Sequence, residues 1–262
     1  MLPSLFLSHG APTLPLDDAP AREFLHGLGK TLGRPRAIVV ATAHWETATP
    51  EVGGAVQPET VHDFRGFPAE LQAMRYPAPG DPALAERISD LLCDAGLRSR
   101  VDRRKGLDHG VWVPLMLMYP KADIPVVPIS VQPHLGPAHH IQLGRALAAL
   151  RGEDILVLGS GSFTHNLSRF RGQAIGAESP PDVTGFADWF DRAIAEGRGC
   201  DLVTYRSLAP EAARQHPTEE HLLPLFVAMG AAGWGRGHAS PAQRLHSSAM
   251  YGVLRMDAYA FG

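Results

Sequence analysis

The chain has little of what marks several common protein classes. Its 262 residues include only two cysteines, Cys93 and Cys200, which are too few for a disulfide scaffold and lack the paired spacing of a thiolate zinc site. Both are expected to be buried thiols in a reducing compartment. No apolar run approaches the roughly 20 residues of a membrane helix, and the N-terminus lacks the basic lead of a secretory signal. These absences predict a soluble, cytoplasmic protein.

The sequence also lacks an excess of either charge. Lysine and arginine total 24 and aspartate and glutamate total 27, which gives a formal net charge of −3. This balance argues against a nucleic acid or a membrane as a partner. Hydrophobic residues at 45% and charged residues at 19% are ordinary for a globular protein and exclude a disordered chain. The expected partner is a small molecule, and no feature indicates an oligomeric state.

What is present is an alternation of strand-like and helix-like segments. Compact apolar runs predict buried strands at 3–8, 37–42, 125–131 and 154–158. Apolar spacing with helix-start and helix-stop residues predicts helices at 17–33, 81–95, 136–151, 182–196 and 219–232. The tail from 245 to 261 contains further strand-like stretches, and the proline- and glycine-rich stretch 53–80 predicts an ordered loop.

This alternation predicts an α/β fold. We expect a single domain over residues 1–262 with a central, mostly parallel or mixed sheet covered by helices on both faces. Pro128 lies inside one predicted strand, which indicates an edge strand or a bulge because proline donates no backbone hydrogen bond.

Histidine is the residue type in excess, with 13 in the chain. His9, His44 and His165 each follow a predicted strand. Loops converge at the carboxyl ends of the strands in an open α/β sheet, so these side chains are expected to meet there. The segment 216–221 adds two imidazoles and two carboxylates at the start of the predicted helix 219–232. Because imidazole binds metals and transfers protons near neutral pH, the cluster predicts a mononuclear iron or zinc centre with open positions.

The other histidines outside the motifs described below are expected to be structural. Three of them, His134, His139 and His140, lie before or at a helix start, which favours surface or capping roles. Three more have no clustered partners, namely His26, His238 and His246.

Seven motifs follow one another in order through nearly the whole chain. They are SHGAP at 8–12, AHWET at 43–47, HDFRGFP at 62–68, YPAPG at 76–80, GLDHGVWVP at 106–114, GSGSFTHNL at 159–167 and HPTEEHLLP at 216–224. This ordered set resembles the class III extradiol ring-cleavage dioxygenases, in particular their 4,5-DOPA dioxygenase branch. Each motif alone is weak, whereas the ordered set is specific.

The resemblance implies a set of metal ligands. His9, His44 and His221 would bind the metal, and Glu219 and Glu220 are rival third ligands because the wider superfamily often supplies a carboxylate. Iron(II) is expected as the working metal, since it can relay electrons between a bound catechol and O2. Zinc(II) can occupy the same site because it binds more tightly, but it cannot deliver electrons to O2.

The resemblance also implies catalytic and supporting roles. His165 would be the acid/base that faces the metal, and a fourth ligand when no substrate is bound. His109 would be a second catalytic group that supports the site or contacts substrate. His216 would steady the helix that carries the third ligand.

Four further residues are candidates for substrate binding. The loop 62–68 offers two aromatic residues and a cation that could flank a ring or pair with a carboxylate. The candidates are His62, Phe64, Arg65 and Tyr251.

The function favoured by the sequence is a metal-dependent extradiol dioxygenase that opens a catecholic, DOPA-like ring beside its hydroxyls and adds both atoms of O2. One alternative is a zinc-dependent hydrolase in which the metal activates water. Another is a non-catalytic binding module on the same fold, which would be expected to lack one of the four histidines.

Overall fold

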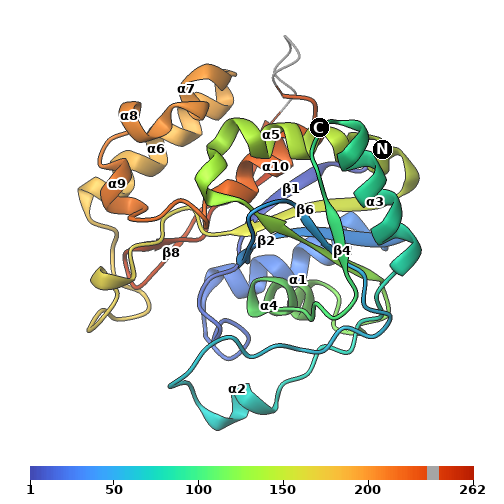
Figure 1. The fold of residues 1–262 in the computed structure, drawn as a ribbon. Coiled ribbons are helices and arrows are strands. Elements are labelled where there is room, and N and C mark those ends of the chain that lie inside the picture. The colour runs from blue at the N-terminus through green and yellow to red at the C-terminus, as the bar shows by residue number, and fades with distance from the viewer. Residues whose placement is uncertain (235–241) are drawn as a thin grey trace.

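The computed structural model describes residues 1–234 and 242–262, and its centre is a mixed eight-stranded sheet with helices on both faces (Figure 1). In spatial order the strands are β4 (Arg100–Asp102), β3 (Glu51–Gly53), β5 (Val126–Val131), β2 (Ala37–Glu46), β6 (Ile155–Gly161), β1 (Ser4–Ser8), β10 (Ala258–Phe261) and β7 (Ala242–His246). The central strands β5, β2, β6 and β1 are parallel, and β10 joins β1 antiparallel. The predicted fold class is confirmed.

Five helices agree with the predicted ones to within a few residues, apart from two ends. They are α1 (Pro20–Leu32), α3 (Pro82–Asp94), α5 (Gly136–Leu147), α6 (Pro181–Ala195) and α10 (Leu223–Ala231). Shorter elements complete the fold: α2 (Ala69–Ala73), α7 (Gly199–Val203), α8 (Tyr205–Leu208), α9 (Ala212–Gln215) and the ribbon of β8 (Ala249–Met250) with β9 (Leu254–Arg255). Within residues 1–234 and 242–262, no helix has both the length and the apolarity to cross a membrane.

Sequence reasoning missed the short helices α2, α7, α8 and α9 and one longer helix. The helix α4 (His109–Met118) is apolar on every side, and nine of its ten residues are buried. A helix buried all round has no polar face, so its sequence shows no period of 3.6 residues. Together with α1 it covers one face of the sheet, while α5 and α10 cover the other (Figure 1).

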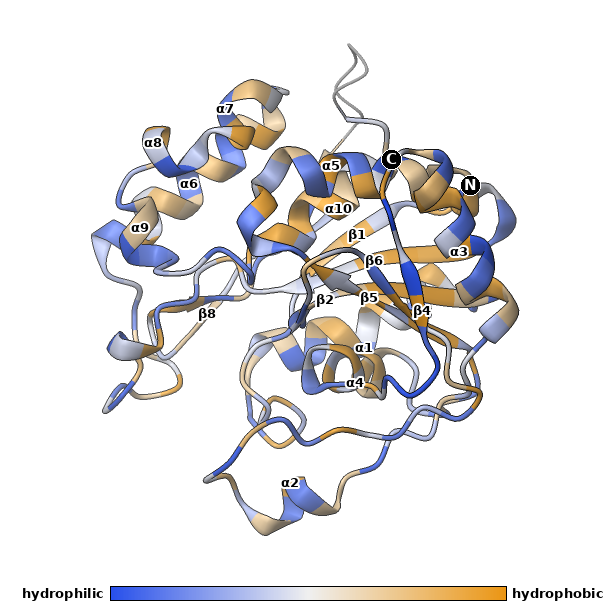
Figure 2. Ribbon diagram, in the orientation of Figure 1, coloured by the Kyte–Doolittle hydropathy of each residue, from blue (hydrophilic) through white to orange (hydrophobic). Residues whose placement is uncertain are grey.

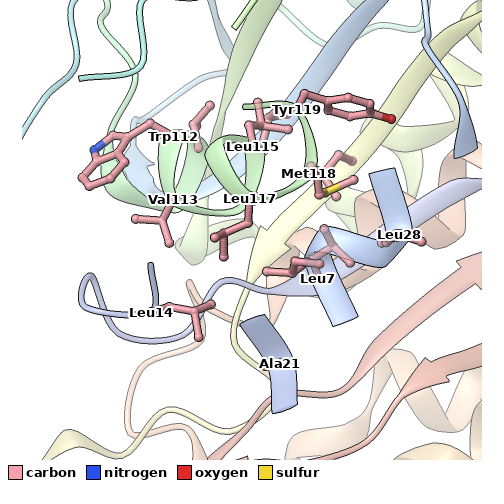
Figure 3. Close-up of a cluster of buried hydrophobic side chains, with 14 of the residues drawn as sticks. Leu7, Leu14, Ala21, Leu28, Trp112, Val113, Leu115, Leu117, Met118 and Tyr119 are labelled. Carbon is pink, nitrogen blue, oxygen red and sulfur yellow. The ribbon is translucent and has the colours of Figure 1, made fainter. Parts of the chain in front are cut away.

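The central strands are buried on both faces, which explains their continuous apolar sequences. In β2, Ile38 and Val40 belong to the core on the α1 and α4 face, and Val39 and Ala41 to the core on the other face. Figure 2 shows the apolar character of the central strands. Figure 3 shows how side chains of α4 meet Leu7 of β1 and Leu28 of α1.

Two expectations about single elements were wrong, and a third was wrong in one of its two alternatives. Cys93 and Cys200 are both exposed, because each lies on the outer side of a surface helix. Strand β5 is interior to the sheet, so the edge alternative for Pro128 was wrong, but its pairing with β2 is irregular just beyond Pro128, which agrees with the bulge alternative. The predicted helix 219–232 begins at Leu223, and the preceding residues form turns.

The histidines assigned structural roles differ in burial. His134 is exposed, as expected, but His140 is fully buried and contradicts the expectation of a surface position. Its Nδ1 donates to the carbonyl of Gly136 and its Nε2 accepts from the backbone N–H of Gln132, so the ring serves the backbone inside the fold. His246 stacks on Phe24. His238 lies outside the described residues.

Candidate metal centre

Three imidazoles converge where the central strands end. His9 follows β1, His44 lies near the end of β2, and His221 lies in the turn before α10. The Nε2 atom of His44 is 3.0 Å from Nε2 of His9 and 3.3 Å from Nε2 of His221. These residues lie far apart in sequence and meet because β1, β6 and β2 are adjacent and parallel. The cluster has the geometry of a group that could hold a metal ion.

The tautomer of His9 follows from the partner of Nδ1, the ring nitrogen that faces away from the other two imidazoles. The Ser160 hydroxyl donates to the carbonyl of Gly110, so it must accept from His9 Nδ1, which lies 3.0 Å away. His9 therefore carries its proton on Nδ1, and the lone pair of Nε2 faces the other two rings.

The outer nitrogens of His44 and His221 face carboxylates. His221 Nδ1 donates to Oε1 of Glu220 at 2.8 Å, and His44 Nδ1 lies 3.5 Å from Oδ2 of Asp63. A carboxylate that lacks its proton can only accept, so His221 carries its proton on Nδ1, and the nearby Asp63 carboxylate favours the same tautomer for His44. Supporting oxygens of this kind fix metal-binding histidines in other proteins.

Burial keeps the three imidazoles neutral. Burial, followed by the neighbouring histidines, lowers the pKa values of His9 and His221 well below 6.5, and burial lowers that of His44 to about 4. Three neutral rings with converging lone pairs and no proton between them repel one another. A cation at their meeting point removes this repulsion, and neutral imidazole is the form that binds a metal. The residues therefore fit a metal ion.

His165 lies beside this cluster. Its ring stacks on that of His221 with centroids 3.4 Å apart and planes 13° from parallel, and its Nδ1 lies 4.0 Å from Oε1 of Glu220. Burial lowers the pKa of His165 to about 4, with Glu220 opposing the shift. The ring is therefore neutral at pH 7 and can accept a proton.

Asp63 holds His109 at the start of α4. One carboxylate oxygen of Asp63 accepts from both the backbone N–H of His109 at 3.1 Å and its Nδ1 at 2.8 Å. Burial alone would raise the pKa of Asp63, but its hydrogen bonds from the side chain and backbone of His109, together with the nearby His44 ring, lower it to about 2. Because Nδ1 of His109 donates to Asp63, its Nε2 is left as an acceptor.

The histidines open onto a cavity of about 430 Å³. Its polar walls are His9, His44, Asp63, His109, Ser162, His165 and Arg171, and its other walls are Gly10, Ala11, Pro12, Phe64, Phe67, Leu167, Phe170 and Leu254. The ring of His221 does not line the cavity, since His165 stacks on it. One end of the cavity can bind a metal, and its sides are apolar and aromatic.

Comparison with known proteins identifies the family. A family model described as the catalytic LigB subunit of aromatic ring-opening dioxygenase matches residues 3–257. The chain belongs to the LigB family. This confirms the resemblance seen in the sequence, and it favours neither the hydrolase nor the binding module. LigB dioxygenases depend on a metal, and the histidine cluster gives this member a potential site for one.

Relatives of this LigB family member share its length and its fold. A protein from Beta vulgaris named 4,5-DOPA dioxygenase extradiol is 44% identical over 98% of this chain and 96% of its own. A protein of the same name from Escherichia coli is 42% identical over 88% of this chain and 85% of its own. The crystal structure of an uncharacterized protein from Escherichia coli K12 has a TM-score of 0.80 and 34% identity, with both chains fully covered.

Of the rival third ligands, Glu219 points to another partner, whereas Glu220 lies with His165 and His221 in a second group that could hold a metal ion. Glu219 accepts a hydrogen bond from the Tyr205 hydroxyl at 2.8 Å, and Glu220 accepts from His221. His216 is fully buried, and its Nε2 donates to the carbonyl of Phe163 at 3.0 Å. It therefore links the segment after β6 to the turn that carries His221.

Of the four candidates for substrate binding, Phe64 lines the cavity, while His62, Arg65 and Tyr251 do not. The Nε2 atom of His62 lies 3.1 Å from the carbonyl oxygen of Met74. The Tyr251 ring packs against Phe170, which lines the cavity, but Tyr251 itself does not line it. The sequence did not single out Asp63 as a site residue, although it lies inside the HDFRGFP motif at 62–68. Its nearness to two histidines is visible only in the fold.

Replacement of Asp63 by asparagine should weaken metal binding by about 10–100-fold, as loss of a supporting carboxylate does elsewhere. The amide lacks the charge that holds the protons of His44 and His109 on Nδ1. Anaerobic iron(II) titration measures the change. The matched control is Asp90→Asn on the exposed face of α3, which should titrate like the wild type. Unchanged affinity in Asp63→Asn would contradict this role.

A close backbone contact fixes the turn that carries His221. The N–H of Ser162 donates to the carbonyl of His221 at 2.8 Å, and a Cβ at Gly161 would lie 2.0 Å from that oxygen. Gly161→Ala should therefore move the turn, lower the free energy of unfolding by about 1–3 kcal/mol and weaken metal binding. Urea unfolding checks the first effect. Gly27→Ala has open space for its Cβ and should not destabilise the protein; equal behaviour of the two variants would refute the argument.

Proposed function

We propose that the protein is an iron(II)-dependent extradiol dioxygenase that opens the ring of a DOPA-like catechol and incorporates both atoms of O2. The observation that carries this proposal is the convergence of three Nε2 lone pairs beside a neutral His165 in a LigB chain. The names of the relatives from Beta vulgaris and Escherichia coli support the choice of substrate. We also propose that residues 1–262 act as one catalytic domain, because strands from both ends of the chain share one sheet.

In this proposal His9, His44 and His221 would hold the metal ion. Bound iron(II) would supply adjacent positions for the catechol oxygens and O2 and would relay electrons between them. Iron is preferred to zinc on chemical grounds, since zinc(II) has no accessible redox change. Zinc(II) can still bind to the same three imidazoles, since the usual order of metal affinities places it above iron(II).

The protein moves the protons. His165 is neutral and lines the cavity, so it can take a proton from a catechol hydroxyl and return it later in the reaction. His109 also lines the cavity, and its free Nε2 can accept a hydrogen bond from the second hydroxyl. The aromatic walls Phe64 and Phe67 flank the ring and exclude water from it.

The experiment is reconstitution without air. Metal-free protein is loaded with iron(II) or zinc(II), mixed with a catechol such as DOPA, and then exposed to O2. We expect one O2 consumed per ring opened, a coloured ring-opened product with iron, and neither with zinc. A monomethyl ether of the same catechol is the matched control and should not react. Conversion of a substrate by the zinc-loaded protein without O2 uptake would support the alternative of a zinc-dependent hydrolase. Absence of O2 uptake by the iron-loaded protein across a broad panel of catechols would refute the proposal.

A further inference from the structure

The cavity carries opposite charges on different walls. Asp63 lies beside His44 and accepts hydrogen bonds from the backbone N–H and Nδ1 of His109, so its carboxylate forms the acidic part of the wall. Of the residues that line the cavity, Arg171 is the one lysine or arginine. Apolar side chains make up most of the remaining wall, including Phe67, Leu167 and Phe170.

The loop that carries Arg171 is anchored on both sides of this residue, and the Arg171 side chain itself is exposed. Asn166 accepts from the backbone N–H of Ser168 and donates from Nδ2 to the carbonyl of Arg214, which fixes the start of the turn η3 (Leu167–Arg169). Arg169 makes two hydrogen bonds to the carboxylate of Asp182, at 2.6 and 3.0 Å.

The next residues continue this loop along the cavity wall. The Phe170 ring packs edge-on against Tyr251 with centroids 4.2 Å apart. The backbone N–H of Tyr251 donates to the carbonyl of Ile175 at 2.9 Å. Arg171 therefore lies between two anchored points of the chain, next to a residue of the wall.

The charge of Arg171 is available to a ligand. Its neighbour Arg169 is paired with Asp182, and Arg214 also lies within 3.4 Å of that carboxylate. Within residues 1–234 and 242–262, no carboxylate lies close enough to Arg171 to form an ion pair with it. A guanidinium at the wall of a partly apolar cavity is suited to a carboxylate, which it can bind through two parallel hydrogen bonds.

We propose that Arg171 determines substrate specificity by binding a carboxylate on the side chain of the catechol. This inference rests on the proposed function and adds to it: the substrate class is a catechol joined through a short apolar linker to a carboxylate. Attraction by Arg171 and repulsion by Asp63 direct the carboxylate away from the metal end, so the hydroxyls point toward His165 and His109.

The test compares three catechols that differ in the charge of one side chain: 3-(3,4-dihydroxyphenyl)propanoate, neutral 4-ethylcatechol and cationic 4-(2-aminoethyl)catechol. In Arg171→Gln we expect kcat/KM for the acid to fall roughly 10-fold, mainly through KM, because the ion pair is present before and during the reaction. The neutral catechol should change less than about 2-fold. Arg171→Glu should favour the cationic catechol over the acid.

Two further variants separate this role from a general effect of charge. Arg98→Gln removes an exposed positive charge between α3 and β4 and should keep the wild-type ratio of acid to neutral catechol. Arg65→Gln tests the arginine of the 62–68 loop, which does not line the cavity. Loss of discrimination in Arg65→Gln with none in Arg171→Gln would overturn the inference.

Anaerobic binding of the same catechols to the iron-loaded protein gives a readout that does not need turnover. We expect the dissociation constants to show the same loss of preference in Arg171→Gln. An equal fall for all three catechols, or an unchanged ratio, would overturn the role of Arg171 and leave the proposed function intact. If the wild type opens no catechol and binds none, both proposals fail.

Discussion

Replacement of His165 by glutamine should lower kcat by about 10²–10⁴-fold while iron content stays at the wild-type level. The imidazole lines the cavity, and burial keeps it neutral, so it can accept a proton that an amide cannot. Steady-state O2 uptake measures the rate and elemental analysis measures the metal. His134→Gln is the matched control, because His134 is exposed in the short 3-10 helix Pro133–Leu135 that precedes α5.

The pH dependence tests the same assignment. Burial lowers the pKa of His165 to about 4, so the ring loses its capacity to accept a proton only as the pH falls toward that value. The acid limb of kcat/KM for the wild type should therefore lie below pH 6, well under the 6.5 of an exposed histidine. The limb should vanish in His165→Gln. A limb centred near 6.5, or a variant with normal kcat, would contradict a proton-transfer role.

Replacement of His44 by alanine should abolish detectable ring opening and weaken iron(II) binding by more than about 100-fold, since loss of even a supporting partner costs up to that much elsewhere. The Nε2 atom of His44 lies within 3.3 Å of Nε2 of both other rings, so its loss removes one of the three converging nitrogens. Anaerobic titration with iron(II) measures the binding.

Thermal unfolding gives an independent readout of this loss. A metal that binds only the folded state stabilises it by about 2.7 kcal/mol at 100 times its dissociation constant. Iron(II) or zinc(II) should therefore raise the Tm of the wild type and of His134→Gln but not of His44→Ala. A chelator should reverse the increase. An equal rise in Tm for His44→Ala would show that the metal binds elsewhere.

Much of the site could be predicted because its residues lie at strand ends. His9, His44 and His165 follow buried apolar segments, and such segments are legible in any sequence. The need for glycine at position 161 could not be predicted from the sequence. A side chain there would collide with the backbone carbonyl of His221. His221 itself was linked to the others only by the resemblance.

Other features were out of reach of sequence reasoning. The partners of the outer nitrogens, Ser160 and Asp63, are far in sequence from the histidines they serve, so no local pattern pairs them. Arg171 drew no attention, because a single arginine in a polar stretch looks like any surface cation. Whether it faces a cavity depends on loop packing.

The sequence by itself determined the α/β class, the family and the histidines that gather at the sheet, because apolar periodicity and ordered motifs are local properties of the chain. The tertiary structure alone decided which nitrogens face one another, which carboxylates hold them and which cation lines the cavity. The physical reason is that these relations are contacts between segments up to 177 residues apart, and the side chains come into contact only when the strands pair.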